Sequence, residues 1–197
     1  MPTCLTLPGL NGSGPDHWQT RWEARGDCER VQFGCWSSPD RAAWLARLDE
    51  AVARASARVI LVAHSLGCHA AAWWAATAPA AHLAKVASAM LVAPPDLDGD
   101  TLMEPLRPFA PPPRGPLPFA SLLVASRDDP YAAFRSSERL AEHWAATLVD
   151  AGRKGHLNAQ SCLGDWPEGR ALLVRLIAEN DVAAPDQPLA LQPENRP

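Results

Sequence analysis

The sequence predicts a single α/β domain built on a six-stranded, mostly parallel, doubly wound sheet with helices on both faces. Short apolar runs alternate with longer segments of helical period, which is the pattern of strands joined by crossover helices. Several of the apolar runs lack polar alternation, as strands covered on both faces do. With 197 residues and 47% hydrophobic residues, the chain can bury one sizeable core but is short for two.

Six runs rich in β-branched or other apolar residues are the expected strands. In chain order they are residues 4–8, 28–33, 58–63, 88–93, 121–126 and 146–151. Five further segments have the period of a helix, and they are residues 16–25, 40–55, 66–78, 131–144 and 167–180. The second of these helices is preceded by Ser38 and opens near Pro39 and Asp40, which are residue types that favour a helix start.

Two segments do not follow this alternation. Residues 94–118 are rich in proline, so regular structure is not expected there. Residues 181–197 form a polar, proline-containing tail, for which we expect disorder. The domain organisation is therefore an α/β domain over residues 1–180 followed by this tail.

Charge and hydropathy narrow the class of partner. The formal net charge is -4 and no Lys/Arg-rich run occurs, which argues against nucleic acid or an anionic membrane as the main partner. No stretch reaches the ~18 consecutive apolar residues of a membrane span, and the first ten residues lack the features of a signal peptide. We expect a cytoplasmic protein whose ligand is small and uncharged or weakly charged; its oligomeric state does not follow from the sequence.

The five cysteines favour neither a disulfide framework nor a metal site. They are Cys4, Cys28, Cys35, Cys68 and Cys162, and no pair has CxxC spacing. We expect all five to be reduced and most of them to be buried.

Residues 58–75, "RVILVAHSLGCHAAAWWA", combine a buried strand with a serine at its end and a helix directly afterwards. This is the pattern of a nucleophile elbow, in which a sharp turn lifts the serine hydroxyl above the edge of the sheet. The small neighbours that the turn needs are Ala63 and Gly67, so the motif reads A-x-S-x-G. Ser65 is the candidate nucleophile, and His64 is expected to shape the elbow rather than to act as the base.

A serine nucleophile needs a histidine base and a carboxylate to orient it, in the chain order Ser, Asp, His. Asp128 and Asp129 follow the fifth predicted strand, and His156 follows the sixth. All candidates thus lie beyond the carboxyl ends of strands, where open α/β sheets bind ligands. Asp129 is preferred because it stands three residues after Ser126, a common register of the triad acid, and Asp128 is the alternative.

The other histidines lack this position after a strand. His17, His82 and His143 fall in or beside predicted helices and are expected to be exposed or half-buried, and His69 lies on the helix after the elbow. His156 is therefore the candidate base.

Acyl transfer also requires backbone N–H groups that stabilise the developing oxyanion. One donor is expected at Leu66, directly after the nucleophile, and a second at Leu10 or Asn11 in the glycine-rich loop after the first strand. The alternative, a phosphate-binding loop, needs other glycine spacing and a lysine that this loop lacks.

Residues 94–118 contain a second alternative motif. Asp96, Asp98 and Asp100 alternate like calcium ligands, but Thr101 and Arg107 stand where a calcium loop needs glycine and glutamate. We expect no metal and no cofactor. Instead this segment is expected to fold over the active site.

Substrate-binding residues are expected from three segments around the predicted site. Residues 94–118 would contribute Met103 and Phe109, together with Leu102 and Leu106. Trp18 follows the oxyanion loop and Trp166 follows the His156 loop, so both are expected to line the pocket. Trp36 is a weaker candidate.

A resemblance to a known family rests on four segments together: "LPGLNGSGPDHWQTRWE", "LVAHSLGCHAAAWWA", "LLVASRDDPY" and "KGHLN". Over about residues 3–178 the chain resembles the small serine hydrolases related to retinoblastoma-binding protein 9 and the bacterial YdeN-type proteins. The resemblance implies a compact α/β-hydrolase fold without a large cap domain, and a triad carried by Ser65, Asp129 and His156. It implies esterase-like or peptidase-like activity but no particular substrate.

The function expected from these observations is cofactor-free hydrolysis of a small ester or amide through an acyl-enzyme on Ser65. Two alternatives stay open on the same fold. One is a binding or scaffold protein without catalysis, which would not need all three triad residues. The other is a lyase or cofactor-free oxygenase that uses the same triad.

Overall fold

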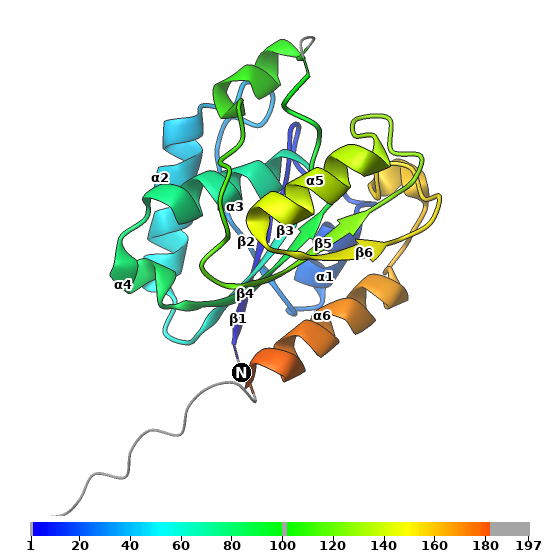
Figure 1. Cartoon of the computed structure of the whole chain (residues 1–197). Coiled ribbons are helices and arrows are strands. Elements are labelled where there is room, and N and C mark those ends of the chain that lie inside the picture. Colours follow the sequence, from blue (N-terminus) through cyan, green and yellow to red (C-terminus); the bar gives the residue numbers. More distant parts are fainter. Residues whose placement is uncertain (1, 100–101, 182–197) are drawn as a thin grey trace, which may run out of the picture.

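The computed structural model describes residues 2–99 and 102–181 and contains a six-stranded sheet in the order β2-β1-β3-β4-β5-β6 (Figure 1). The strands are β1 (Thr3–Leu7), β2 (Glu29–Arg30), β3 (Val59–His64), β4 (Val86–Val92), β5 (Ala120–Ala125) and β6 (Thr147–Asp150). All neighbouring pairs are parallel, with Leu61 of β3 opposite Leu5 of β1 and Ala89 of β4. The strand order reverses direction beside β1 and β3, which is where open α/β sheets form their ligand crevice.

The helices alternate with these strands along the chain, as the sequence predicts, and α6 follows the last strand. They are α1 (Trp18–Ala24), α2 (Arg41–Arg54), α3 (Leu66–Thr77), α4 (Ala80–Leu83), α5 (Phe134–Trp144) and α6 (Pro167–Asp181), with 3-10 helices η1 (Glu104–Phe109) and η2 (Ala159–Ser161). The short elements α4, η1 and η2 were not expected from the sequence. Within the described residues, no helix has the length and hydropathy needed to cross a membrane.

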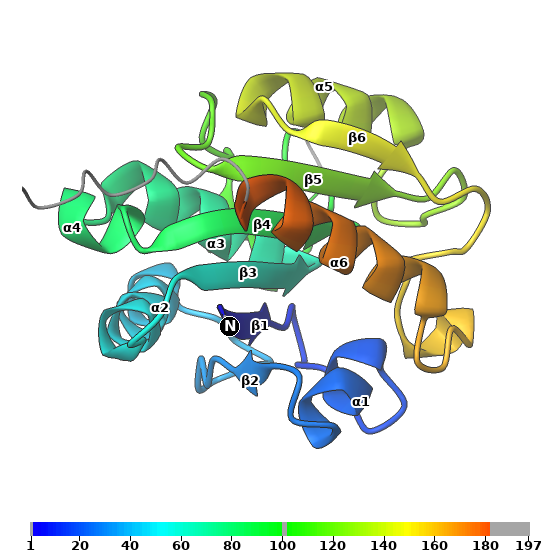
Figure 2. The same cartoon turned by 90° about the horizontal axis from the view of Figure 1, so that it is seen from below.

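Two hydrophobic cores lie on opposite faces of the sheet because side chains alternate along each strand. Leu61 and Ala63 of β3 belong to the core under α2, α3 and α5, whereas Ile60 and Val62 belong to the core under α1 and α6. Figure 2 shows α6 crossing in front of the sheet and α3 behind it. The predicted doubly wound α/β fold is therefore confirmed.

The edge strand β2 is shorter than predicted, with two residues where the sequence suggested six. Val31 and Phe33 are nevertheless only 2% exposed each, and the Phe33 ring stacks on Trp44 of α2 at 4.5 Å. The apolar pattern of residues 28–33 thus reflects burial against a helix rather than strand pairing.

The proline-rich connection between β4 and β5 contains the 3-10 helix η1, contrary to the expectation of no regular structure. Pro105 lies in its first turn, where a missing backbone N–H costs nothing. The connection carries no large cap domain in the residues that the structure describes. The predicted tail at residues 181–197 lies outside the described residues except for Asp181, the last residue of α6.

The prediction that all five cysteines are reduced is wrong, because Cys4 and Cys28 form a disulfide. Cys4 lies in β1, and Cys28 directly precedes β2, whose Glu29 pairs with Leu5. The parallel pairing of the two strands therefore brings the two cysteines together across 24 residues of sequence. Of the free cysteines, Cys68 is buried, whereas Cys35 and Cys162 are exposed.

Candidate active site

Ser65 occupies a strained turn between β3 and α3. Its backbone has φ 55° and ψ -126°, a conformation that a residue other than glycine rarely adopts. Gly67 is required two residues later, since a Cβ there would lie 2.1 Å from the Leu7 carbonyl oxygen. Ala63, the departure from the commoner glycine, fits into the core with no exposed surface.

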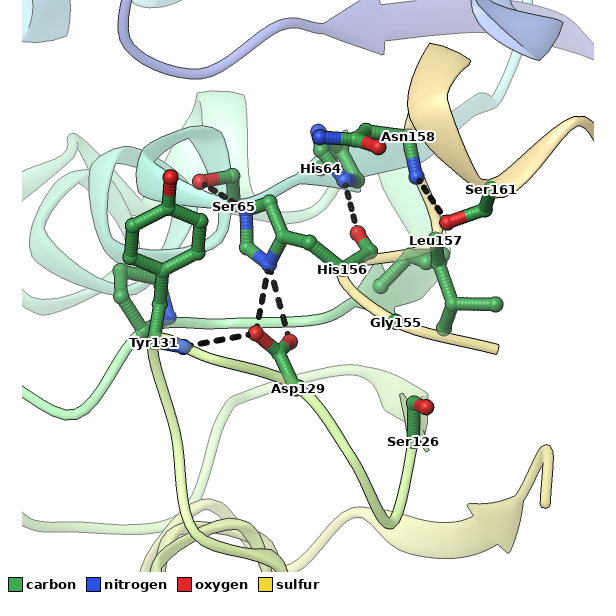
Figure 3. A network of polar contacts seen from close by, with 12 residues as sticks. His64, Ser65, Ser126, Asp129, Tyr131, Gly155, His156, Leu157, Asn158 and Ser161 are labelled. Atoms are coloured by element: carbon green, nitrogen blue, oxygen red, sulfur yellow. Dashed lines mark hydrogen bonds and ion pairs between the residues drawn. The ribbon is translucent and has the colours of Figure 1, made fainter. Parts of the chain in front are cut away.

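Ser65, His156 and Asp129 form a hydrogen-bonded chain (Figure 3). The Ser65 Oγ lies 3.0 Å from His156 Nε2, and His156 Nδ1 lies 3.0 and 2.9 Å from the two Asp129 carboxylate oxygens. A carboxylate only accepts hydrogen bonds, so Nδ1 carries the proton and Nε2 can accept the serine hydroxyl. The side chains of His156 and Asp129 are 9% and 3% exposed, which protects this chain from water.

The two neighbouring aspartates have different contacts. Asp129 Oδ1 also accepts the Tyr131 backbone N–H at 2.9 Å, which fixes the carboxylate under His156. Asp128 accepts the Gly155 backbone N–H and the Ser126 hydroxyl, each at 2.9 Å. These two hydrogen bonds lower the pKa of Asp128, the one from Gly155 most strongly. Asp128 thus links the loop after β5 to the loop that carries His156.

The backbone around His156 is held by donors from other elements. His64 Nε2 donates to the His156 carbonyl at 2.9 Å, and Trp18 Nε1 donates to the Leu157 carbonyl at 2.8 Å. Trp22 Nε1 donates to the Asp165 carbonyl at 2.8 Å. His64 therefore supports the elbow and the His156 loop together, in line with a shaping role rather than that of the base.

Two of the predicted pocket tryptophans belong to the core instead. Trp18 and Trp166 are 1% and 2% exposed, and their rings contact each other at 5.0 Å beneath the His156 loop. Phe109 has no exposed surface and packs edge-on against Trp44. These three predictions are wrong because sequence position does not show which face of its element each aromatic ring occupies. Trp36, the weaker candidate, packs in the same core as Trp44.

His17 was expected to be at least half-exposed, yet it is 4% exposed and lines the active-site cavity. It caps the start of α1, where its Nδ1 accepts the Gln19 backbone N–H at 3.2 Å. Its ring meets His64 edge-on at 4.6 Å, and the His64 ring lies 4.9 Å from His156. The sequence signal for this position of His17 was its place directly before a helix with two tryptophans, where a capping residue is expected. Histidine is not among the usual capping residues, so the capping role was not predicted.

Burial keeps His17 and His64 neutral. Burial lowers the pKa of His17 to about 3, with smaller contributions from Arg30 and His156. Burial also holds the pKa of His64 well below its usual range, and the repulsion that a protonated His64 would meet from protonated His17 or His156 adds to this effect. Neither ring therefore places a positive charge beside His156.

The predicted oxyanion donors are only partly available. Among the hydrogen bonds of the described residues, none is donated by the backbone N–H of Leu10 or Leu66. The Asn11 N–H, by contrast, donates to the Trp36 carbonyl at 2.8 Å, so Asn11 is wrong as a donor. Gly9 allows the close approach of the two segments, because a Cβ on it would lie 2.7 Å from Ser65 Cβ and 3.0 Å from Leu66 N.

A cavity of about 330 Å³ opens beside Ser65. The residues that line it are Leu10, Asn11, Gly12, His17, His64, Ser65, Pro95, Met103, Leu106, Tyr131, His156, Asn158 and Gln160. Met103 and Leu106 come from residues 94–118, as expected for a segment that folds over the site. Tyr131, Asn158 and Gln160 were not expected in the lining.

The aspartates of the calcium-like motif have other partners. Asp96 accepts the Ser136 hydroxyl, and Asp98 pairs with Arg114 at 3.0 Å. Asp100 lies outside the described residues. Across residues 2–99 and 102–181, no three His, Cys, Asp or Glu side chains gather in a way that could hold a metal ion.

A comparison with known families shows to which family the chain belongs. The model of the serine hydrolase family matches residues 4–175, most of the chain. The chain belongs to the serine hydrolase family. This serine hydrolase has no significant match among curated proteins.

Solved structures of similar fold are numerous. A YdeN-like hydrolase from Pectobacterium atrosepticum is 30% identical with a TM-score of 0.79, covering 91% of this chain and 92% of its own. The ydeN gene product of B. subtilis is 21% identical with a TM-score of 0.72, over 90% of this chain and 100% of its own. Est1E from Butyrivibrio proteoclasticus, solved with ferulic acid bound, is 12% identical with a TM-score of 0.65, over 90% of both chains. The likeness to the last two shows the fold alone.

Proposed function

We propose that this serine hydrolase cleaves small esters or amides without a cofactor, through an acyl-enzyme on Ser65. The observation that carries the proposal is the hydrogen-bonded chain from Ser65 Oγ through the His156 imidazole to the Asp129 carboxylate. These are the contacts by which a histidine activates a serine and a carboxylate orients the histidine.

In the first half of the reaction, His156 Nε2 takes the proton of Ser65 as Oγ attacks the substrate carbonyl carbon. The carbonyl oxygen becomes an oxyanion that the free N–H groups of Leu10 and Leu66 are suited to stabilise. His156 then returns the proton to the leaving alcohol or amine as the bond to the carbonyl carbon breaks. Asp129 stabilises the intermediate imidazolium and keeps the proton of Nδ1 in place.

In the second half, water replaces the alcohol or amine. His156 removes a proton from the water as its oxygen attacks the acyl carbon, and it then protonates Ser65 Oγ as the acyl bond breaks. The products are the free acid and the restored enzyme. The cavity of about 330 Å³ lies near the lower end of ligand pockets, which supports a small substrate.

The test is covalent labelling with a fluorophosphonate followed by peptide mapping. We expect the adduct on Ser65, no adduct in the Ser65→Ala variant, and an adduct of normal yield in the control Ser38→Ala, whose serine is exposed. Ser65→Ala should lower kcat by on the order of 10³-fold or more. An adduct on Cys68 or on another serine, with Ser65 unmodified, would overturn the proposal.

A further inference from the structure

The cavity beside Ser65 has a polar wall and an apolar wall that come from different loops. The polar wall consists of Asn11 and His17 from the β1–α1 loop, which also contributes Leu10 and Gly12, together with Asn158 and Gln160 from the β6–α6 loop. The apolar wall consists of Pro95, Met103 and Leu106 from the β4–β5 connection together with Tyr131 from the β5–α5 loop. In Figure 3, Tyr131 and Asn158 lie on opposite sides of the His156 ring.

The polar wall offers carboxamides with unused hydrogen-bonding groups. Asn158 Oδ1 accepts the Gln160 backbone N–H at 3.0 Å, which fixes the direction of the Asn158 side chain. Within the described part of the chain, Asn158 Nδ2 and the side chains of Gln160 and Asn11 make no hydrogen bond. Carboxamides donate and accept hydrogen bonds but carry no charge.

Apart from the proposed base His156, the described residues that line the cavity carry no charge. Among the described residues that line it, none is Asp, Glu, Lys or Arg, and burial keeps His17 and His64 neutral. A charged substrate group would therefore lose its hydration without gaining an opposite charge, which is costly. An uncharged polar group would exchange water for the carboxamides at little cost.

The proton transfer from His156 indicates which wall binds the leaving group and which wall binds the acyl group. His156 Nε2 must protonate the departing atom, so the leaving group lies on the side of His156. Asn158 and Gln160 follow His156 on the same loop, within four residues of it. On this ground we assign the leaving group to the polar wall that continues from His156, and the acyl group to the other wall, with Met103 and Leu106.

We propose, on the basis of the proposed function, that the substrate joins a small apolar acyl group to an uncharged polar leaving group that carries a carboxamide or hydroxyl. Asn158 and Gln160 are the specificity-determining residues for this leaving group. The apolar wall receives the acyl group, and the small cavity limits the size of both parts.

Butyrate esters of four alcohols of similar size test the proposal: glycolamide, isobutanol, glycolate and 2-aminoethanol. The first is polar and neutral, the second apolar, the third anionic and the fourth cationic. We expect kcat/KM for the glycolamide ester to exceed that for the isobutyl ester by ~10-fold, which corresponds to one or two neutral hydrogen bonds. Both charged esters should be poorer than the glycolamide ester by at least that factor.

Variants assign the preference to the polar wall. In Gln160→Ala the ratio of glycolamide to isobutyl ester should fall several-fold, whereas Gln32→Ala, an exposed glutamine outside the cavity, should keep the ratio of the unmodified protein. Asn158→Asp retains the oxygen that accepts the Gln160 N–H and adds a negative charge. It should raise kcat/KM for the 2-aminoethyl ester relative to the glycolate ester, by ~10-fold.

Equal kcat/KM for the glycolamide and isobutyl esters, or a ratio unchanged in both variants, would overturn the inference while leaving hydrolysis on Ser65 intact. The proposed function fails differently. In that case none of the four esters would be hydrolysed faster than by Ser65→Ala, and fluorophosphonate would not label Ser65.

Discussion

Two connections border the cavity, and each is held by one histidine and two tryptophans that donate to its backbone carbonyls. After β6, the donors are His64, Trp18 and Trp22, and the acceptors are His156, Leu157 and Asp165. After β4, the donors are His69, Trp73 and Trp144, and the acceptors are Pro95, Phe109 and Pro113. The six donor–acceptor distances all lie between 2.8 and 2.9 Å.

The two connections differ in what this support fixes. In the β6 connection the acceptors include His156 itself and its neighbour Leu157, so the donors fix the proposed base. In the β4 connection they fix backbone positions on both sides of Met103, which is itself 51% exposed. The same type of hydrogen bond thus holds the proposed base in one connection and the backbone on both sides of a cavity-lining residue in the other.

The largest loss of activity is expected from a substitution that removes the carboxylate beside His156. Asp129→Asn keeps the shape of the side chain but favours the wrong tautomer of His156, which should lower kcat by on the order of 10⁴-fold. Asp128→Asn is the matched control, since Asp128 accepts from Gly155 and Ser126 and does not contact His156. Steady-state kinetics on folded variants compares them, and greater damage from Asp128→Asn would reverse the assignment of the acid.

The next largest expected effect is the loss of folding stability at acid pH. Burial lowers the pKa of His69 from 6.5 to about 4, and it also lowers that of His64. Between the lowered pKa and 6.5 the unfolded state binds more protons than the folded state, so stability is complete above pH 6.5 and falls as the pH drops. Within this window each such histidine costs about 1.4 kcal/mol of unfolding free energy per pH unit.

His69→Gln tests this in the β4 connection, because glutamine retains a donor for Pro95 but does not titrate. Urea unfolding at pH 7.5, 6.0 and 5.0 should show a weaker pH dependence than in the unmodified protein, by about 1.4 kcal/mol per pH unit. His143→Gln, which replaces an exposed histidine, is the control. An unchanged slope in His69→Gln would contradict the prediction.

A pair of tryptophan substitutions, one for each connection, is expected to have a smaller effect and compares the two connections directly. Trp18→Phe and Trp73→Phe each leave one backbone carbonyl without its indole donor, at Leu157 and at Phe109 respectively. Such a loss costs roughly 1–3 kcal/mol, so both variants should unfold at a lower temperature. Only Trp18→Phe should also lower kcat, by about 10-fold, because it loosens the residue next to His156. Equal kcat values in the two variants would remove the distinction between the connections.

Local patterns predicted the fold and the three residues of the hydrogen-bonded chain. The strand before Ser65, the helix after it and Gly67 are neighbours in sequence, and a parallel sheet brings the carboxyl ends of its strands to one edge. For that reason Asp129 and His156 could be assigned to the same edge as Ser65 from their positions after strands.

The errors concern contacts that depend on tertiary packing. Cys4 meets Cys28 only because β1 pairs with β2, and a strand pattern does not fix the order of strands in a sheet. Trp18 follows the oxyanion loop in sequence but points into the core beneath it. His17 is buried beside His64 of β3, whose ring lies 4.6 Å away, and nothing in the segment around His17 indicates that contact.

The smallest expected effect concerns the exposed part of the β4 connection. Met103 lines the apolar wall, so a short acyl chain should gain contact with it, whereas longer chains extend into water and add no transition-state binding. In the unmodified protein kcat/KM should therefore fall from short-chain to palmitoyl esters of one leaving group.

Met103→Ala should lower the ratio of kcat/KM for the butyryl ester to that for the acetyl ester by about 4-fold, which corresponds to one buried methylene. Val174→Ala, at an exposed position of α6 outside the cavity, should leave the ratio unchanged. A steady rise of kcat/KM to the longest chains would instead indicate a tunnel beyond the apolar wall.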